Sequence, residues 1–215
     1  MTERFDPYEL LALAAPGAVL AILGATASPA FQAYLKGGEG MSLGGLGFFL
    51  LVSIVAGHLV QALANLAEAV YWGAWGGMPT VRLLSENGLL SAPQRSRLAA
   101  LLEQDGILAR PPISAKDWGG AVGEMRARIS TSGQSARLDA FLRTYGLMRG
   151  VAVAFLIATV AAPFSDNIWI WWHVSAISAT AAIISGYRAH RFAVHFAREL
   201  AVRYLSASHA GKRPK

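Results

Sequence analysis

The sequence predicts an all-α polytopic membrane protein with four transmembrane helices, short cytosolic helices between spans 2 and 3, and a fourth helix extended into the cytoplasm. Four apolar stretches lie at about residues 10 to 27, 43 to 62, 150 to 163 and 168 to 187. A hydrocarbon core roughly 30 Å thick needs about 20 apolar residues of helix. Hydrophobic residues make up 54% of the 215 residues and charged residues only 15%, whereas soluble domains typically carry about 25% charge.

The distribution of Lys and Arg predicts the orientation of these spans. Residues 28 to 42 hold one basic residue and 163 to 169 none, whereas 74 to 140 hold eight and 188 to 215 hold seven. Because basic residues concentrate in cytoplasmic loops, we expect a multi-pass protein with both termini in the cytoplasm. Its basic inner face would attract the anionic headgroups of the lipid bilayer, so the net charge of +6 does not indicate direct nucleic-acid binding.

In chain order, this topology divides the sequence into four parts. They are a first transmembrane helix pair (1–75), a cytosolic helical segment (76–140), a second transmembrane helix pair with a cytosolic extension (141–207), and a disordered basic tail (208–215). The N-terminal MTERFDPYEL lacks the basic region of a signal peptide, so the first apolar stretch is expected to remain as a span.

The first span carries Pro16 and Gly17 near its middle. A proline there removes a backbone hydrogen bond and kinks the helix, which could serve as a hinge. Since Pro and Gly are commoner in membrane helices than in soluble ones, we favour a purely structural bend. Residues 28 to 42 then predict a short, glycine-rich outer turn.

The second span is the most informative stretch because polar residues follow one of its faces. The four polar residues are His58, Gln61, Asn65 and Glu68. Their spacing of 3, 4 and 3 residues places them on one side of a helix. They could line a pore or form a polar packing seam between helices or protomers. Small residues suited to close helix packing are Gly44, Gly45, Ser53 and Gly57. If hydrocarbon begins at Leu43, about 20 residues reach Ala62, so Asn65 and Glu68 are expected beyond it.

The central segment predicts two short helices. Ser91 and Gln94 match a capping box, with Pro93 in the first turn. A second helix is expected from Ser114 to a break at residues 130 to 135. Helices this short cannot bury a core alone, so they should dock on each other, on the membrane surface or on a partner.

The third helix is expected to begin near Ser135. Arg149 should then reach the cytosolic headgroups by snorkelling, with Glu68 as the alternative partner.

The fourth helix should continue past the membrane to about Ser206, because no breaker interrupts it. A basic stripe on that extension comprises Arg188, Arg191, His195 and Arg198. It could contact anionic lipid or latch onto Glu68.

Catalytic and metal-binding patterns are absent from the sequence. No Walker A sequence, nucleophile elbow or dinucleotide fingerprint occurs. The chain contains no cysteine, which excludes disulfides and thiolate ligands. His58 and Glu68 are about 15 Å apart along a helix, too far to share a metal. We therefore expect no enzyme activity, cofactor or metal.

Three stretches resemble a loosely defined set of uncharacterised bacterial four-helix inner-membrane proteins, some of them encoded beside antiphage defence genes. They are PYELLALAAPGAVL, GHLVQALANLAEAVYWGAWGGMP (57–79) and FLRTYGLMRG. The resemblance implies the bacterial inner membrane and a membrane effector or accessory subunit, with no catalytic residue.

Two functions follow as hypotheses. The first is a homo-oligomeric, pore-forming or membrane-perturbing effector controlled from its cytosolic face, with the second span lining the path. The alternative is a non-catalytic membrane scaffold or accessory subunit that binds a cytosolic protein partner. A small-solute transporter is a third possibility, but the sequence shows no inverted repeat that would favour it.

Overall fold

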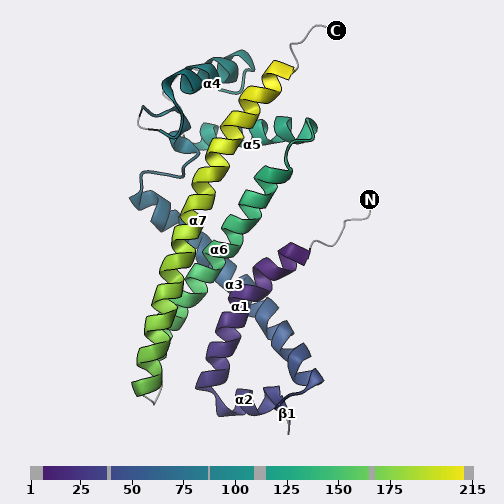
Figure 1. The fold of residues 1–215 in the computed structure, drawn as a ribbon, viewed down its shortest axis with the longest axis vertical. Helices are drawn as coiled ribbons and strands as arrows, with labels where there is room; N and C mark the ends of the chain where they lie inside the picture. Colours follow the sequence, from purple (N-terminus) through teal and green to yellow (C-terminus); the bar gives the residue numbers. More distant parts are fainter. Residues whose placement is uncertain (1–6, 38–39, 87, 109–114, 165–167, 211–215) are drawn as a thin grey trace. The chain divides into compact units, whose positions relative to one another are not determined.

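The computed structural model describes residues 7–37, 40–86, 88–108, 115–164 and 168–210. Their regular secondary structure is helical apart from a two-residue antiparallel pairing of β1 (Lys36–Gly37) with β2 (Gly40–Met41) (Figure 1). The α-helices are α1 (Pro7–Ala27), α2 (Pro29–Leu35), α3 (Leu43–Ala74), α4 (Ala92–Gln104), α5 (Ala115–Thr131), α6 (Ala136–Ala161) and α7 (Ile168–Ala210). Two 3-10 turns are η1 (Val81–Leu84) and η2 (Ala162–Phe164). The prediction of an all-helical fold is confirmed.

Within the described residues, two helices are long and apolar enough to cross a membrane. They are Leu43–Ala74, which is α3, and Ala136–Phe164, which is α6 with η2. A shorter apolar helical stretch covers Leu10–Thr26 of α1. The prediction of four spans is therefore met in part, and its finer form is taken up below.

The chain packs into two compact units. The first comprises Met1–Tyr71 and Arg143–His190, and the second comprises Trp72–Leu142 and Arg191–Lys215. The second unit thus combines the predicted cytosolic segment with the end of α7. It holds 14 of the 19 Lys and Arg but only 7 of the 13 Asp and Glu, so the chain's net positive charge lies there.

In the first unit, α1 and α3 cross in backbone contact. Gly17 is buried, and a methyl group added to it would overlap the carbonyl oxygen of Ser53. A methyl group on Gly57 would overlap the carbonyl oxygen of Leu13. Only glycine permits so close an approach at both positions. This crossing fixes which face of α3 is turned toward α1.

The membrane-length parts of α6 and α7 run antiparallel within the same unit (Figure 1). The Ser175 hydroxyl donates to the carbonyl oxygen of Thr159 at 3.1 Å. Three buried alanines four residues apart are Ala154 and Ala158 on α6 and Ala162 at the start of η2. Such small side chains allow helix backbones to approach in a membrane.

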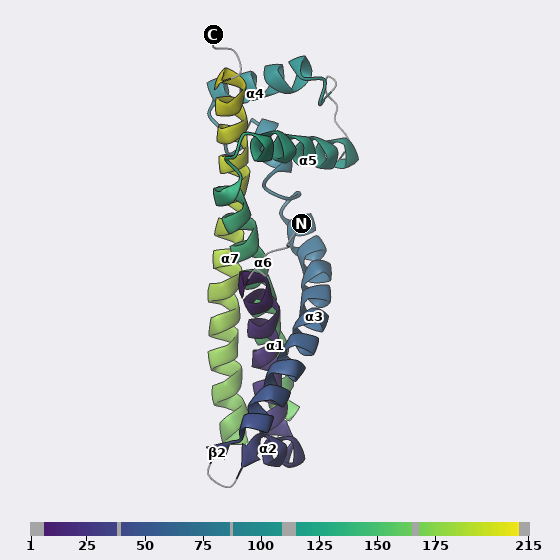
Figure 2. The same cartoon turned by 90° about the vertical axis from the view of Figure 1, so that its right-hand side faces the viewer.

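The second unit has its own apolar core. It is built from η1, α4, α5, the start of α6 and the end of α7, and its largest fully buried side chains include Leu83, Leu98, Leu102, Met125, Ile129, Leu138, Leu200 and Tyr204. Figure 2 shows α4 and α5 lying across the line of α7. The short helices of the central segment therefore dock on each other, which is one of the predicted outcomes, and also on the end of α7.

Several predicted boundaries are confirmed. Gln94 accepts hydrogen bonds at the start of α4 from the Ser91 backbone N–H and hydroxyl, at 3.1 and 3.0 Å. The third helix begins at Ala136, as predicted, and α7 continues through Ser206. The cap predicted at Ser114 lies outside the described residues.

Other boundaries differ from the predictions. Residues 28 to 42, predicted as a turn, contain α2 and the β1–β2 pairing. Residues 208–210 of the predicted disordered tail belong to α7, since no breaker precedes Gly211.

Candidate functional site

Gln61 on α3 joins three helices of the first unit. Its side-chain amide nitrogen donates to the carbonyl oxygens of Ala12 on α1, at 3.1 Å, and Gly146 on α6, at 3.3 Å. Ala12 lies four residues before Pro16, whose ring nitrogen has no hydrogen to donate. The Ala12 carbonyl has therefore lost its intrahelical donor, and Gln61 replaces it. Neighbouring helices commonly satisfy carbonyls freed by proline in this way.

A glycine on α6 makes room for this amide. Gly150 is buried, and a methyl group there would lie 2.5 Å from the Gln61 amide nitrogen. Gly146 and Gly150 are four residues apart, so both lie on the α6 face that receives Gln61. A larger residue at position 150 would displace the side chain that ties α6 to α1 and α3.

Arg149 continues the polar contacts from α6 toward α3. Its Nη1 forms an ion pair with Glu68 Oε2, and its Nη2 donates to Asn65 Oδ1 at 2.7 Å and to Gln61 Oε1 at 3.4 Å. The guanidinium lies over the Tyr145 ring, 5.6 Å from its centroid. The Arg149 and Glu68 side chains are only 21% and 19% exposed. Burial makes each charge depend on the other for compensation.

We call Gln61, Asn65, Glu68 and Arg149 the polar seam. Three of the four residues predicted on the polar face of the second span thus share one partner. The fourth, His58, is exposed and makes no hydrogen bond or ion pair with the part of the chain that the structure describes. Arg149, for which snorkelling to headgroups was the favoured interpretation, lies instead with the alternative partner, Glu68.

The predicted packing residues occupy different environments. Ser53 and Gly57 lie at the α1 crossing, and Ser53 is fully buried. Gly45 is buried, and its backbone N–H donates to the Ser42 hydroxyl at 2.9 Å. Gly44 is exposed, with open space where a side chain would extend. The structure therefore places one part of this set against α1 and leaves Gly44 on an outer surface.

The predicted basic stripe on α7 is mostly exposed. Arg188, Arg191 and Arg198 are exposed, and His195 is half-buried. The His195 ring stacks on Phe141, with centroids 6.0 Å apart and an interplanar angle of 21°. His195 thus packs within the second unit, while the three arginines have the exposure that a lipid contact requires.

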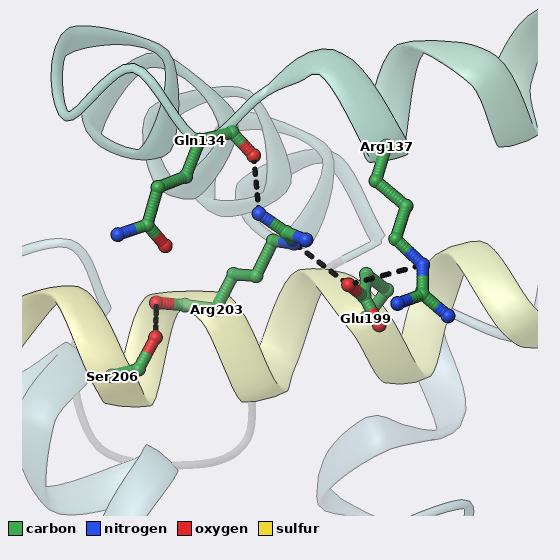
Figure 3. A network of polar contacts seen from close by, with 5 residues as sticks. All are labelled: Gln134, Arg137, Glu199, Arg203 and Ser206. Atoms are coloured by element: carbon green, nitrogen blue, oxygen red, sulfur yellow. Dashed lines mark hydrogen bonds and ion pairs between the residues drawn. The ribbon is translucent and has the colours of Figure 1, made fainter.

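A second group of polar contacts fastens the second unit together. Arg203 donates to Glu199 Oε1 and to the carbonyl oxygen of Gln134, each at 2.7 Å, and Arg137 approaches Glu199 at 3.5 Å (Figure 3). These contacts hold the turn between α5 and α6 against α7. We therefore assign these contacts a structural role within the second unit.

Asp105, at the end of α4, is the meeting point of two further contacts. The Tyr204 hydroxyl donates to Asp105 Oδ2 at 2.5 Å, and Arg128 Nη1 pairs with the same oxygen at 2.6 Å. Burial raises the pKa of Tyr204, and the hydrogen bond to Asp105 raises it further. Tyr204 therefore serves as a neutral donor that links α7 to α4.

Sequence reasoning missed several of these contacts. Pro16 was a signal for the freed Ala12 carbonyl, although the sequence does not say which donor reaches it. Tyr71 hydrogen-bonds to His190 Nδ1 at 2.9 Å, and Tyr8 hydrogen-bonds to the Thr144 hydroxyl at 3.3 Å. Neither pair has a sequence signature, since its members lie more than 100 residues apart.

Among the residues described, no group of three or more His, Asp or Glu side chains is placed to hold a metal ion. Comparisons with protein-family models, with curated proteins and with solved structures found no match to this chain.

Proposed function

We propose that this protein is a non-catalytic scaffold or accessory subunit of the bacterial inner membrane, with a cytosolic helical unit that binds a partner protein. The contacts of Arg149 are the observation that favours a scaffold over a pore. Gln61, Asn65 and Glu68 direct their polar atoms to Arg149 and to backbone carbonyls of α1 and α6. Side chains engaged in this way hold helices together and are not available to line an ion path.

The finer part of the proposal is a topology of four spans with both termini in the cytoplasm. The bond Tyr8–Thr144 joins α1 to α6, and the bond Tyr71–His190 joins α3 to α7. Because Arg149 on α6 pairs with Glu68 on α3 nearby, we take the two bonds to mark one level. Each helix has a tyrosine near that level, and tyrosine favours membrane interfaces. These residues are Tyr8, Tyr71, Tyr145 and Tyr187. We take this level as the inner boundary of the hydrocarbon.

Helix lengths support that boundary. From the tyrosine level to its outer end, each of α1, α6 with η2, and α7 has about 19 residues, or about 29 Å at a rise of 1.5 Å per residue. This length matches a hydrocarbon core of roughly 30 Å. α3 is longer, and it runs obliquely in Figure 1, as a tilted span would.

The same boundary revises the depth expected for the seam. Glu68 precedes Tyr71 by three residues, or about 4.5 Å along α3, and Arg149 lies about 6 Å along α6 from Tyr145. Both would then lie within the inner leaflet, whereas the count from Leu43 predicts Glu68 beyond the hydrocarbon. Charged side chains at this depth pair with one another and face the bundle interior.

A pore-forming or membrane-perturbing effector controlled from the cytosol is the second candidate. Its supporting observation is His58, an ionisable residue exposed on a helix apolar enough to span a membrane. Such residues usually face a protein interior or a water-filled cavity. In an oligomer, the exposed face of α3 could supply the wall of such a cavity.

Topology and conductance are tested on the purified protein and its single-cysteine variants, since the chain has no cysteine. A membrane-impermeant maleimide should label Phe164→Cys in intact spheroplasts, because Phe164 is 86% exposed at the end of η2, on the outer side. Ala100→Cys, on an exposed site of α4, should react only after lysis. The reverse pattern, or a protein extracted by carbonate, would overturn the topology.

Ion flux then separates the two candidates. Liposomes that contain the wild-type protein should stay tight if it is a scaffold. Flux in the wild type that changes with Glu68→Gln, at equal incorporation, would reject the scaffold in favour of a pore.

A further inference from the structure

The outer face of α3 carries a polar residue among apolar ones. His58 is exposed, and its exposed neighbours include Leu51, Val55 and Leu59. It lies about 20 Å along the helix from Tyr71, well inside the span under the topology proposed above. Lipid tails offer no hydrogen-bond partner to an imidazole at that depth. A protein surface is therefore needed to satisfy it.

Some of the exposed residues around His58 follow a heptad repeat. Gly44, Leu51, His58 and Asn65 are all exposed and lie seven residues apart. Four residues after the last three of them come Val55, Ala62 and Ala69, which are exposed too. A repeat of 3.5 residues is the spacing of a left-handed helix pair. The buried face used within the chain is a different one, marked by Ser53, Gly57, Val60 and Ala64.

We propose that a second copy of this chain packs along the heptad face of α3, with His58 hydrogen-bonded to His58 of the second copy. A two-fold axis brings such a face against itself, and both copies run parallel because they share one topology. A neutral imidazole has one donor and one acceptor nitrogen, so two copies satisfy each other. Gly44, Ala62 and Ala69 are small enough to let the two backbones approach.

This inference rests on the proposed membrane topology, and disulfide cross-linking tests it. Leu51→Cys and Val55→Cys variants, oxidised in native membranes, should form covalent dimers. Leu51 is 61% exposed and lies on the heptad face. The matched control is Leu63→Cys, which is 47% exposed but points about 120° away from Leu51 around the helix. Cross-linking at Leu63 in place of Leu51 and Val55 would overturn the proposal.

A second measurement tests the role of His58 directly. In vesicles of phosphatidylethanolamine and phosphatidylglycerol, the dimer dissociation constant is measured by energy transfer between labelled copies. His58→Leu should raise this constant roughly three- to thirtyfold, the effect of one interhelical hydrogen bond in a membrane. His58→Asn, which keeps a donor and an acceptor, should retain most of the affinity, and Leu63→Ala should leave it unchanged.

Two outcomes would reject the second copy. One is a wild-type protein that stays monomeric in these vesicles, and the other is a dimer that His58→Leu does not weaken. Either result leaves the topology standing if maleimide labelling gives the expected pattern. Failure of that labelling would instead reject the proposed topology, so the two failures are distinguishable.

Discussion

Gln61 on α3 donates its side-chain amide to the carbonyl oxygen of Ala12 on α1, 3.1 Å away. This carbonyl is the one that Pro16 deprives of its intrahelical donor. The proline and the residue that compensates for its missing N–H therefore lie on different helices. Pro16 is fully buried, so the freed carbonyl has little access to water. The packing of α1 and the integrity of its backbone hydrogen bonds depend on the same side chain.

Gln61→Leu should destabilise the protein by about 1–3 kcal/mol, because it leaves the Ala12 carbonyl without a donor. The same substitution should cost about 1 kcal/mol less in a Pro16→Ala background, where residue 16 regains its backbone N–H. The measurement is unfolding by SDS in mixed micelles, followed by the fluorescence of the six tryptophans. Equal costs in the two backgrounds would show that Gln61 does not compensate Pro16.

The sequence predicted the polar face of α3 but not how that face is divided. At 100° per residue, the four positions cover an arc of about 80°. His58 and Asn65 occupy its outer edge and are exposed, whereas Gln61 and Glu68 occupy the inner edge and are half-buried. Spacing alone gives the arc. Its division depends on where α1 and α6 pack, and that is fixed by contacts with Gly17, Gly57 and Gly150.

The helix boundaries were easier to predict because their signals are local. The Ser91 cap and the continuous α7 follow from neighbouring residues, and both were found. The partner of Arg149 was harder, since snorkelling and pairing with Glu68 are both compatible with the sequence. The contacts of the second unit could not be read from the sequence, because Asp105 and Tyr204 lie 99 residues apart.

Breaking the Arg149–Glu68 pair should be more harmful than removing it entirely. Arg149→Met leaves the largely buried Glu68 uncompensated and should cost about 3 kcal/mol or more. Arg149→Met combined with Glu68→Met replaces both charges with apolar groups and should recover much of that loss. SDS unfolding of Arg149→Met, Glu68→Met, the double variant and the wild type completes a double-mutant cycle. Additive losses would contradict the pairing.

The α1–α3 crossing predicts which small residues matter. Gly57→Ala places a methyl group on the Leu13 carbonyl oxygen. Overpacking of this kind should lower the free energy of unfolding by about 1–3 kcal/mol. Gly186→Ala is the matched control on α7, where nothing lies within 4 Å of the added methyl. It should be neutral or slightly stabilising, since alanine favours the helix. SDS unfolding that ranks the two variants equally would contradict the crossing.

A hydroxyl at the same crossing provides a local comparison. The Ser53 hydroxyl is fully buried and has no hydrogen-bond partner among the described residues. Ser53→Ala removes an unsatisfied polar group and should therefore preserve or raise stability, in contrast to Gly57→Ala, one turn away. A loss with Ser53→Ala comparable to that of Gly57→Ala would mean that the hydroxyl has a partner after all.

Tyr204 predicts how the second unit responds to alkaline pH. Its pKa is raised in the folded protein by burial and by the hydrogen bond to Asp105, so folding favours the protonated phenol. The resulting stability is fully present below the ordinary tyrosine pKa of about 10 and is lost as pH rises toward the folded-state pKa.

Tyr204→Phe should lower the free energy of unfolding by about 1–2 kcal/mol at pH 7 and reduce the further loss of stability between pH 9 and 11. Tyr187→Phe, at an exposed tyrosine, controls for the titration of the other tyrosines. If the wild type and Tyr204→Phe lose the same stability over this range, the Tyr204 proton does not contribute to holding α7 against α4.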